Sequence, residues 1–285
     1  MKDFRGKTAF ITGGASGIGY GMARAFGRAG MNIVIADIER DVAGKAADML
    51  NKDQIKAVAV HCDVAIRNEL QRAALEAVAA FGKIHIVCNN AGVGAGGNFG
   101  SIGERDWDWI IDVNLKGVIY GAETFVPLIK SHGEGGHIVN TASMAGMISP
   151  PRMEPYSATK FAVVAMSEGW AQQLAEFGIG VSVLCPGFVR TRIHESGRTR
   201  QERYGAMREQ REDDNEVRAA TAQFIASGID PLVVGERVLE AVKANELYIF
   251  THPDMKDALE TRFEEIRAAF DRARESEALR SVKKS

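Results

Sequence analysis

The stretch Lys7–Gly19, KTAFITGGASGIG, leads from an apolar, β-branched run into a cluster of glycines at the start of a helical pattern. Glycines let a backbone turn tightly and approach a pyrophosphate closely, and the N-terminus of a helix offers free N–H groups and the positive end of a dipole. The spacing here is Gly-x-x-x-Gly-x-Gly, not the Gly-x-Gly-x-x-Gly of the common dinucleotide fingerprint. A glycine turn that serves only helix–strand packing is the alternative, and the position of the turn in the chain decides between the two.

The rest of the chain alternates short apolar runs with longer helical patterns. Strands are expected at 8–12, 32–37, 57–63, 84–89, 137–142, 180–185 and 247–250, and helices at 17–30, 41–51, 66–81, 105–131, 155–177 and 232–244. Several strands are apolar at consecutive positions, which is typical of burial on both faces of a parallel sheet. The alternation predicts an α/β fold, a Rossmann-type doubly wound parallel sheet in a single domain. We expect a dinucleotide-binding catalytic domain at 1–252 and a C-terminal helical extension at 253–285.

Two segments depart from this alternation. Segment 188–228 is densely charged, with eight Arg and seven Asp or Glu between Arg190 and Arg218. It is either a solvated helical surface or a mobile lid over the substrate, because it follows a strand end where α/β sheets bind ligands. The tail carries one apolar stripe at helical spacing, made of Met255, Leu259, Phe263, Ile266 and Phe270. This stripe packs either on its own domain or on a partner subunit.

Composition excludes several classes of function. The 285 residues include 35 Lys and Arg against 37 Asp and Glu, and a net charge of −2 gives no long-range field to attract nucleic acid. No apolar stretch is long enough for a membrane span, and the N-terminus shows no signal-peptide pattern. Cys62, Cys88 and Cys185 lie in or beside apolar runs, as expected of buried, reduced thiols, so a cytoplasmic location is expected. The six histidines form no metal-binding motif, and no Gly-x-Ser-x-Gly elbow of a serine hydrolase occurs.

Asp37 ends the apolar run NIVIAD, 18 residues after Gly19. An acid at this place can accept hydrogen bonds from both hydroxyls of an adenine ribose, and it would repel a 2′-phosphate. No Lys or Arg follows Asp37 directly, and Arg40 is the nearest cation in the sequence. The pattern therefore predicts NAD rather than NADP, with a surface aspartate at a strand end as the alternative.

Tyr156 and Lys160 stand four residues apart in PYSATKFAV, so a helix places them on one face, one turn apart. A free tyrosine has a pKa of about 10, too high for a general base at neutral pH. A nearby ammonium stabilises the phenolate and lowers that pKa. Pro155 suits a first helical turn, which would put Tyr156 near the positive end of the dipole. An exposed Tyr–Lys pair without function is the alternative.

Two further residues favour the chemical interpretation. Ser143 follows the run HIVNTA, so we expect its hydroxyl at the carboxyl edge of the sheet, where substrates bind. Asn114 lies inside a long helical pattern, although its side chain competes with the backbone for hydrogen bonds. We therefore expect a local irregularity of the helix at Asn114, and an exposed, harmless asparagine is the alternative.

With these residues in place, the sequence resembles the short-chain dehydrogenase/reductase family over about residues 4–250. Thr12–Gly19 is similar to the family's cofactor turn, Asn89–Gly92 to its NNAG motif beside the central sheet, and Cys62–Val64 to its adenine-contacting segment. The catalytic tetrad of the family is matched in order and spacing by Asn114, Ser143, Tyr156 and Lys160. The cofactor-binding residues that the resemblance implies are Gly13, Ala15, Ser16, Gly17, Ile18, Gly19, Asp37, Asp63, Val64, Asn90, Ala91, Gly92, Tyr156, Lys160, Pro186, Gly187, Val189 and Thr191.

The resemblance also implies roles for these residues. Ser143 and Tyr156 would hydrogen-bond the substrate oxygen, and Tyr156 would exchange the hydroxyl proton. Lys160 would lower the pKa of Tyr156 and bind the nicotinamide ribose, and Asn114 would hold a water that relays the proton to solvent. Asp63 would lie near the adenine amino group, and the segment Pro186–Thr191 would contact the nicotinamide carboxamide. The family further implies a homodimer or homotetramer, assembled through helices 105–131 and 155–177.

The substrate is less sharply indicated. A soft, apolar pocket wall is expected from Val93, Gly94, Met144, Ala145, Met147, Met153 and Phe188, although the methionines could equally be core fill. This wall favours a lipophilic small molecule, a hydrophobic secondary alcohol or ketone, with aromatic ones included. Short stretches, MKDF…FITGGASG and the late LYI, resemble bacterial Cα-dehydrogenases that oxidise benzylic alcohols of lignin-derived aryl ethers. The alternatives are a hydroxysteroid or other lipophilic alcohol dehydrogenase, a 3-oxoacyl-carrier-protein reductase, which Asp37 disfavours, and an NAD-binding sensor or scaffold without catalysis.

Overall fold

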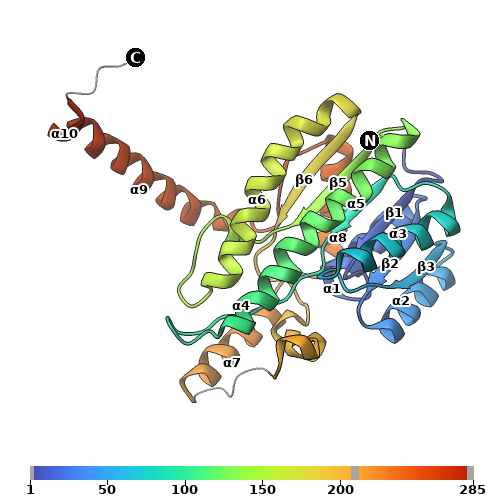
Figure 1. Cartoon of the computed structure of the whole chain (residues 1–285), viewed down its shortest axis with the longest axis horizontal. Coiled ribbons are helices and arrows are strands. Elements are labelled where there is room, and N and C mark those ends of the chain that lie inside the picture. The colour runs from blue at the N-terminus through green and yellow to red at the C-terminus, as the bar shows by residue number, and fades with distance from the viewer. Residues whose placement is uncertain (1–2, 207–211, 281–285) are drawn as a thin grey trace. The chain divides into compact units, whose positions relative to one another are not determined.

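The computed structural model describes residues 3–206 and 212–280, and within them one parallel sheet organises the chain (Figure 1). Its strands are β1 (Thr8–Thr12), β2 (Asn32–Asp37), β3 (Ala57–His61), β4 (Ile86–Asn89), β5 (Gly136–Thr141), β6 (Ile179–Cys185) and β7 (Tyr248–Phe250). Their order is β3-β2-β1-β4-β5-β6-β7, and each neighbouring pair is parallel. The strand order reverses between β1 and β4, and a doubly wound sheet binds ligands at the carboxyl ends beside such a switch point.

Helices cover both faces of this sheet. They are α1 (Gly17–Arg28), α2 (Arg40–Lys52), α3 (Arg67–Phe81), α4 (Glu104–Ile111), α5 (Gly117–His132), α6 (Glu154–Leu174), α7 (Glu212–Ala226) and α8 (Pro231–Ala244). One apolar core joins the sheet to α1, α2 and α8, through residues such as Phe26, Leu50 and Val238. A second core joins it to α3, α4 and α5, through Leu70, Trp109 and Phe125. The strands are therefore buried on both faces, which confirms the predicted Rossmann-type α/β fold.

The expected helix 105–131 is not continuous. It is divided into α4, a π-helical turn at Asp112–Lys116 and α5. Asn114 is in the middle of the π turn, so the expected irregularity at this residue is present. The expected helix 155–177 ends as α6 at Leu174 and continues as a 3₁₀ turn, and the strand expected at 57–63 ends at His61. The other expected boundaries agree with the structure to within two residues.

The charged segment 188–228 contains 3₁₀ turns at Ile193–Thr199 and Glu202–Tyr204, followed by α7. Its residues 207–211 lie outside the described residues. The chain divides into two compact units, Met1–Thr251 and His252–Ser285. The second unit holds a 3₁₀ turn at Pro253–Met255, α9 (Lys256–Glu275) and α10 (Glu277–Arg280). Across the described ranges, no helix combines the length and the apolar character that crossing a membrane requires.

Candidate active site

The glycine turn between β1 and α1 is shaped to receive an anion. Gly13 and Gly17 have φ angles of 60° and 54°, a region that L side chains rarely adopt. A Cβ on Gly19 would lie 2.1 Å from the carbonyl oxygen of Gly13, so the turn closes on itself only with glycine there. No side chain among the described residues caps the start of α1, and its first turn holds no acidic residue. The first N–H groups of α1 are therefore left for a ligand.

Asn90 fixes this turn to the centre of the sheet. Its Nδ2 donates to the carbonyl oxygen of Thr12 at 3.0 Å, and its Oδ1 accepts from Thr141 Oγ1 at 3.2 Å. Thr12 Oγ1 in turn accepts from the backbone N–H groups of Asn90 and Ala91, at 2.9 and 3.0 Å. The ends of β1, β4 and β5 are thus held together beside the turn. Sequence analysis missed Thr141, which no motif marks.

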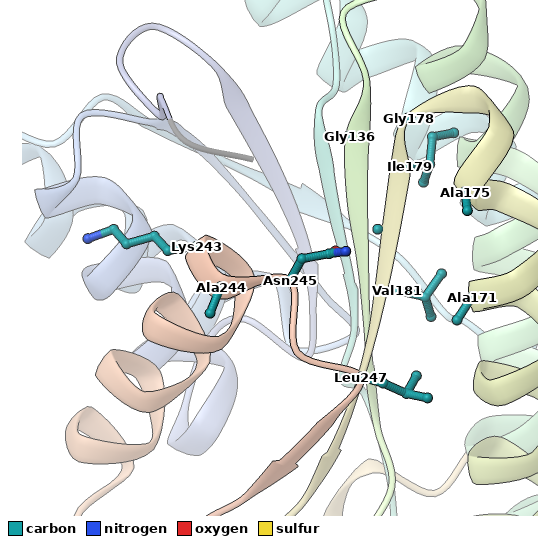
Figure 2. A pocket seen from close by; sticks show the side chains of 11 residues that line it. Gly136, Ala171, Ala175, Gly178, Ile179, Val181, Lys243, Ala244, Asn245 and Leu247 are labelled. Atoms are coloured by element: carbon teal, nitrogen blue, oxygen red, sulfur yellow. The ribbon is translucent and has the colours of Figure 1, made fainter.

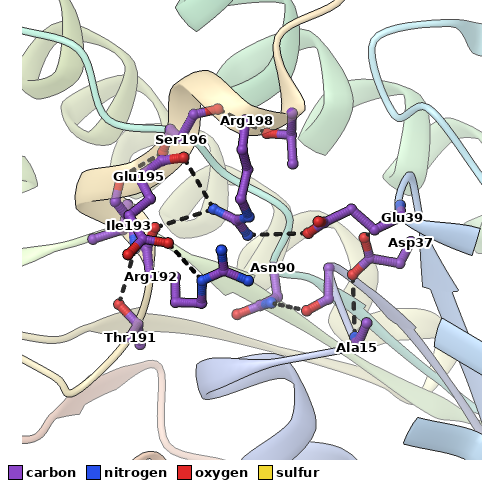
Figure 3. Close-up of polar contacts among 12 residues, drawn as sticks. Ala15, Asp37, Glu39, Asn90, Thr191, Arg192, Ile193, Glu195, Ser196 and Arg198 are labelled. Atoms are coloured by element: carbon purple, nitrogen blue, oxygen red, sulfur yellow. Dashed lines mark hydrogen bonds and ion pairs between the residues drawn. The ribbon is translucent and has the colours of Figure 1, made fainter. Parts of the chain in front are cut away.

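Asp37 ends β2 next to the glycine turn (Figure 3). Its carboxylate accepts hydrogen bonds from the backbone N–H groups of Ala15 and Glu39, each at 3.1 Å. The residue is buried, and burial raises the pKa of the carboxyl group against these hydrogen bonds. The structure therefore places a buried carboxylate of fixed orientation beside the glycine turn.

Asp63 and Val64 follow the neighbouring strand, β3. Asp63 Oδ1 accepts from the backbone N–H of Ala65 at 3.0 Å, and its Oδ2 accepts from Arg203 Nη2 at 2.8 Å. Val64 packs against Gly117 of α5, where a Cβ would lie 2.9 Å from Val64 Cγ2. Buried carboxylates thus lie at the carboxyl ends of the neighbouring strands β2 and β3.

Tyr156 and Lys160 lie on one face of α6, as the spacing predicts. Pro155 is in the first turn of α6, and Lys160 Nζ lies 5.5 Å from the centre of the Tyr156 ring. Both side chains are buried, and Lys160 Nζ donates to the carbonyl oxygen of Thr141 at 2.8 Å. Lys160 is thereby held under Tyr156 and not extended into solvent, which excludes the exposed-pair alternative.

Burial governs the ionisation of this pair. Desolvation raises the pKa of Tyr156, and a hydrogen bond with Ser143 opposes this rise. The pKa of Tyr156 is therefore raised, whereas the sequence predicted that Lys160 would lower it. Desolvation also lowers the pKa of Lys160 from 10.5 to about 8. Charging either group alone inside the protein is unfavourable.

Ser143 follows β5 at the carboxyl edge of the sheet and caps the 3₁₀ turn Met144–Gly146. Its Oγ accepts from the backbone N–H of Ala145 at 3.0 Å. Its own hydroxyl points to the carbonyl oxygen of Pro186 at 3.5 Å, a long contact for an O–H donor. The hydroxyl can therefore turn to a closer acceptor.

Asn114 is fully buried in the π turn, so the exposed alternative is excluded. Its Oδ1 accepts from the backbone N–H of Val93 at 2.8 Å, and its Nδ2 donates to the carbonyl oxygen of Val93 at 2.9 Å. A Cβ built on Gly92 would lie 3.3 Å from Asn114 Oδ1 and 3.6 Å from Lys160 Nζ. Asn114 and Lys160 therefore converge on the chain that follows β4.

The segment after β6 completes this arrangement. The carbonyl oxygen of Pro186 accepts from the backbone N–H of Met144 at 2.9 Å, which ties the segment to the turn after Ser143. Val189 is buried, and Thr191 contacts the glycine turn, since a Cβ on Gly17 would lie 3.0 Å from its Cγ2. The catalytic and cofactor-binding residues inferred from the sequence thus surround one edge of the sheet.

The residues of the expected pocket wall differ in burial. Val93, Met144 and Ala145 are buried, Gly94, Met147 and Met153 are half-buried, and Phe188 is exposed. The Phe188 ring stacks on Phe224 of α7, with centroids 5.3 Å apart. The wall is thus part core and part surface.

A cavity of about 560 Å³ lies elsewhere, beside the amino ends of β5 and β6 (Figure 2). It is lined by Gly136, Ala171, Ala175, Gly178, Ile179, Gly180, Val181, Lys243, Ala244, Asn245 and Leu247. None of the candidate site residues lines it, and parallel sheets bind ligands at the opposite edge. We therefore do not assign it to the active site.

The structure also brings together His85, His132 and Glu134, a cluster that no sequence motif marks. The ring nitrogens of both histidines are already in hydrogen bonds. His85 Nδ1 accepts from the backbone N–H of Thr8 at 3.1 Å, and His132 Nδ1 accepts from that of Glu134 at 3.2 Å. The remaining nitrogens lie 3.0 Å from Glu134 Oε2 and 2.9 Å from the carbonyl oxygen of Ile84. These contacts favour a hydrogen-bonded cluster over a metal site.

Comparison with known proteins agrees with this geometry. A family model described as short chain dehydrogenase matches residues 7–202. The C alpha-dehydrogenase of Sphingobium sp. (strain NBRC 103272 / SYK-6) is 40% identical over 268 residues, which cover 93% of this chain and 87% of that protein. The 3beta-hydroxysteroid dehydrogenase 2 of Eggerthella lenta is 35% identical over 240 residues, covering 81% and 92%.

A solved structure is similar over nearly the whole chain. It is a short chain dehydrogenase/reductase from Burkholderia phymatum in complex with NAD, with a TM-score of 0.91 and 36% sequence identity. The match covers 94% of this chain and 97% of that one. Fold, motif matches and relatives agree, and we conclude that the chain belongs to the short-chain dehydrogenase/reductase family of oxidoreductases.

Proposed function

We propose that the chain transfers a hydride between NAD and a hydrophobic, in particular aromatic, secondary alcohol or its ketone, with Tyr156 as the general acid and base. The carrying observation is that buried Tyr156 lies one turn before buried Lys160 on α6, and that Lys160 is hydrogen-bonded to Thr141 of β5, two residues before Ser143, at the sheet edge that also holds the glycine turn. The glycine turn, the uncapped start of α1 and the carboxylate of Asp37 suit the pyrophosphate and adenine ribose of a dinucleotide.

Each residue has a distinct task in this proposal. Ser143, whose hydroxyl contacts the carbonyl oxygen of Pro186 at the long distance of 3.5 Å, donates to the substrate oxygen. Tyr156 takes the hydroxyl proton in alcohol oxidation and returns it in ketone reduction. The Lys160 ammonium stabilises the phenolate by its charge, and Asn114 positions the chain after β4 through Val93. The nicotinamide ring, when bound, supplies the hydride acceptor.

NAD is preferred to NADP in this proposal because of Asp37. Its buried carboxylate would face a 2′-phosphate with a like charge, whereas ribose hydroxyls can donate to it. The similar structure from Burkholderia phymatum binds NAD, which supports the same choice.

The substrate class rests on the partly apolar wall around Val93, Met144 and Met153 and on the relatives. The name C alpha-dehydrogenase supports a benzylic alcohol, and a hydroxysteroid is the second candidate because of the Eggerthella lenta relative. A sensor or scaffold without catalysis is disfavoured because Tyr156 and Lys160 are both buried on one face of α6, and ionisable side chains are rarely buried without a role.

The test is an absorbance assay for NADH formation with NAD or NADP and a panel of benzylic, steroidal and aliphatic secondary alcohols. We expect turnover with NAD and a benzylic alcohol. Tyr156→Phe should abolish turnover while NADH still binds. Tyr248→Phe, which removes an exposed hydroxyl bonded to Glu168, is the matched control and should stay active. Near-normal turnover by Tyr156→Phe would refute the assignment.

We further propose a homodimer or homotetramer in a reducing, cytoplasmic compartment. Helix α6 carries Phe161, Ala162, Val163, Val164 and Ala165, of which Ala165 is exposed and Phe161 and Ala162 are half-buried. The three cysteines are free and buried, as reduced thiols would be. A monomer mass in light scattering would refute the oligomer.

A further inference from the structure

The segment after β6 crosses the carboxyl edge of the sheet toward its other half. Ser196 Oγ accepts from the backbone N–H of Gly94, just after β4, at 3.0 Å. Farther along, Arg198 Nη2 donates to Glu39 Oε2, just after β2, at 3.1 Å (Figure 3). Since β1 lies between β4 and β2, the segment passes over the end of β1, where the glycine turn begins.

A second ion pair extends this crossing to β3. Arg203 Nη2 lies 2.8 Å from Asp63 Oδ2, and only 6% of the Asp63 side chain is exposed. The Arg203 guanidinium also lies 4.7 Å from the centre of the Tyr204 ring, and the Tyr204 hydroxyl donates to Asp112 Oδ2 at 2.8 Å. Arg203 is therefore held in place and neutralises a nearly buried carboxylate.

The two carboxylates so engaged flank the adenosine half of the proposed cofactor site. Glu39 lies two residues after Asp37, the last residue of β2. Asp63 lies two residues after the end of β3, the strand next to β2. A carboxylate has about four lone-pair positions, so Asp63 can keep Arg203 and still accept from a ligand amino group. A guanidinium plane can also stack on a purine ring.

We propose that Arg198 and Arg203 form the outer wall of the adenosine subsite, so that the adenosine half of the nucleotide binds beneath the segment Ile193–Tyr204 and not in an open groove. This inference rests on the proposed NAD-binding function. It adds to the proposed site two residues of the segment that follows β6, in the other half of the sheet. The nucleotide then enters and leaves only when both ion pairs separate, and the segment expected to cover the substrate also controls nucleotide affinity.

The test uses ADP-ribose, which carries the adenosine half without the nicotinamide, in isothermal titration calorimetry. Arg198→Ala and Arg203→Ala should each weaken ADP-ribose binding by about tenfold, as expected for one lost charge-assisted contact. Arg237→Ala is the matched control, since Arg237 on α8 is comparably exposed and forms an ion pair with Glu246, which follows that helix, so this variant should leave binding unchanged. Unchanged or tighter binding by both wall variants would overturn the proposal, because tighter binding means that the arginines compete with the nucleotide.

Trypsin digestion of the unaltered protein gives a second measurement that needs no variant to fold. Saturating ADP-ribose should slow cleavage after Arg198 and Arg203, and equal rates with and without it would overturn the wall. If the unaltered protein binds no ADP-ribose at all, the proposed NAD function fails and this inference fails with it. The unaltered protein could instead bind ADP-ribose while both variants keep its affinity and ADP-ribose leaves the cleavage rates unchanged. In that case only the proposed wall is wrong.

Discussion

Replacing Asn114 by alanine removes a fully buried side chain that holds the backbone of Val93 through two hydrogen bonds, of 2.8 and 2.9 Å. Val93 is itself 6% exposed, so water cannot readily replace the lost partner. Each buried polar group left without a partner costs about 1–3 kcal/mol. We therefore expect Asn114→Ala to lower the free energy of unfolding by about 2–6 kcal/mol.

Two further variants separate hydrogen bonding from packing. Asn114→Leu restores the volume without the hydrogen bonds and should also be destabilised. Asn114→Asp keeps the acceptor for the N–H of Val93 but loses the donor to its carbonyl oxygen, so its loss should be intermediate. Urea unfolding followed by circular dichroism, at one protein concentration for all variants, measures the difference. A loss below about 1 kcal/mol for Asn114→Ala would refute the positioning role derived from these contacts.

Three other predictions follow from the same site. Gly19→Ala should abolish NADH binding in a fluorescence titration, because its Cβ would lie 2.1 Å from a carbonyl oxygen, whereas Gly44→Ala in α2, with open space around it, should bind normally. Burial raises the pKa of Tyr156, so kcat/KM for alcohol oxidation should rise with pH above neutrality until Lys160 loses its charge at a pH of about 8, and a flat profile would contradict a tyrosine base. The pKa of Lys160 is about 8 in the folded chain and 10.5 in the unfolded chain. Between these pH values the unfolded chain binds more protons at this residue, so Lys160 makes the free energy of unfolding rise with pH. Relative to Lys160→Met, the unaltered protein should therefore gain up to about 3 kcal/mol in urea unfolding between pH 7 and 10, and an equal pH dependence would contradict the charged, buried lysine.

The features that the sequence predicted are those that depend on local chain geometry. The turn at Gly13–Gly19 needs residues without a Cβ, and its glycines are visible in the sequence. Tyr156 and Lys160 share a helix face because their spacing equals about one turn. An irregularity at Asn114 was foreseeable because an interior asparagine rarely suits a regular helix, and the structure shows that it is a π turn.

The features that the sequence did not predict depend on contacts between distant segments. Arg198 forms an ion pair with Glu39, 159 residues away in the sequence. The sequence had shown only Arg40 as a cation near Asp37. Arg203 reaches Asp63 across 140 residues. Neither pair leaves a periodic pattern, since an ion pair needs only two opposite charges brought together by the fold. We expected a lowered pKa for Tyr156, and this prediction was wrong for a related reason. Burial raises that pKa, and the burial depends on all the surrounding segments.

Burial of Tyr156 and Lys160 together would let the proposed tyrosine base operate despite its raised pKa. Desolvation disfavours the phenolate and the ammonium separately, since each is a single charge in a medium of low polarity. A phenolate formed beside an ammonium creates two opposite charges, whose attraction is stronger there than in water. The proton of Tyr156 is therefore most easily removed while Lys160 remains charged. Because Lys160 holds its proton up to a pH of about 8, the pair is suited to proton transfer near neutrality, and removing the lysine charge should suppress oxidation more than NADH binding.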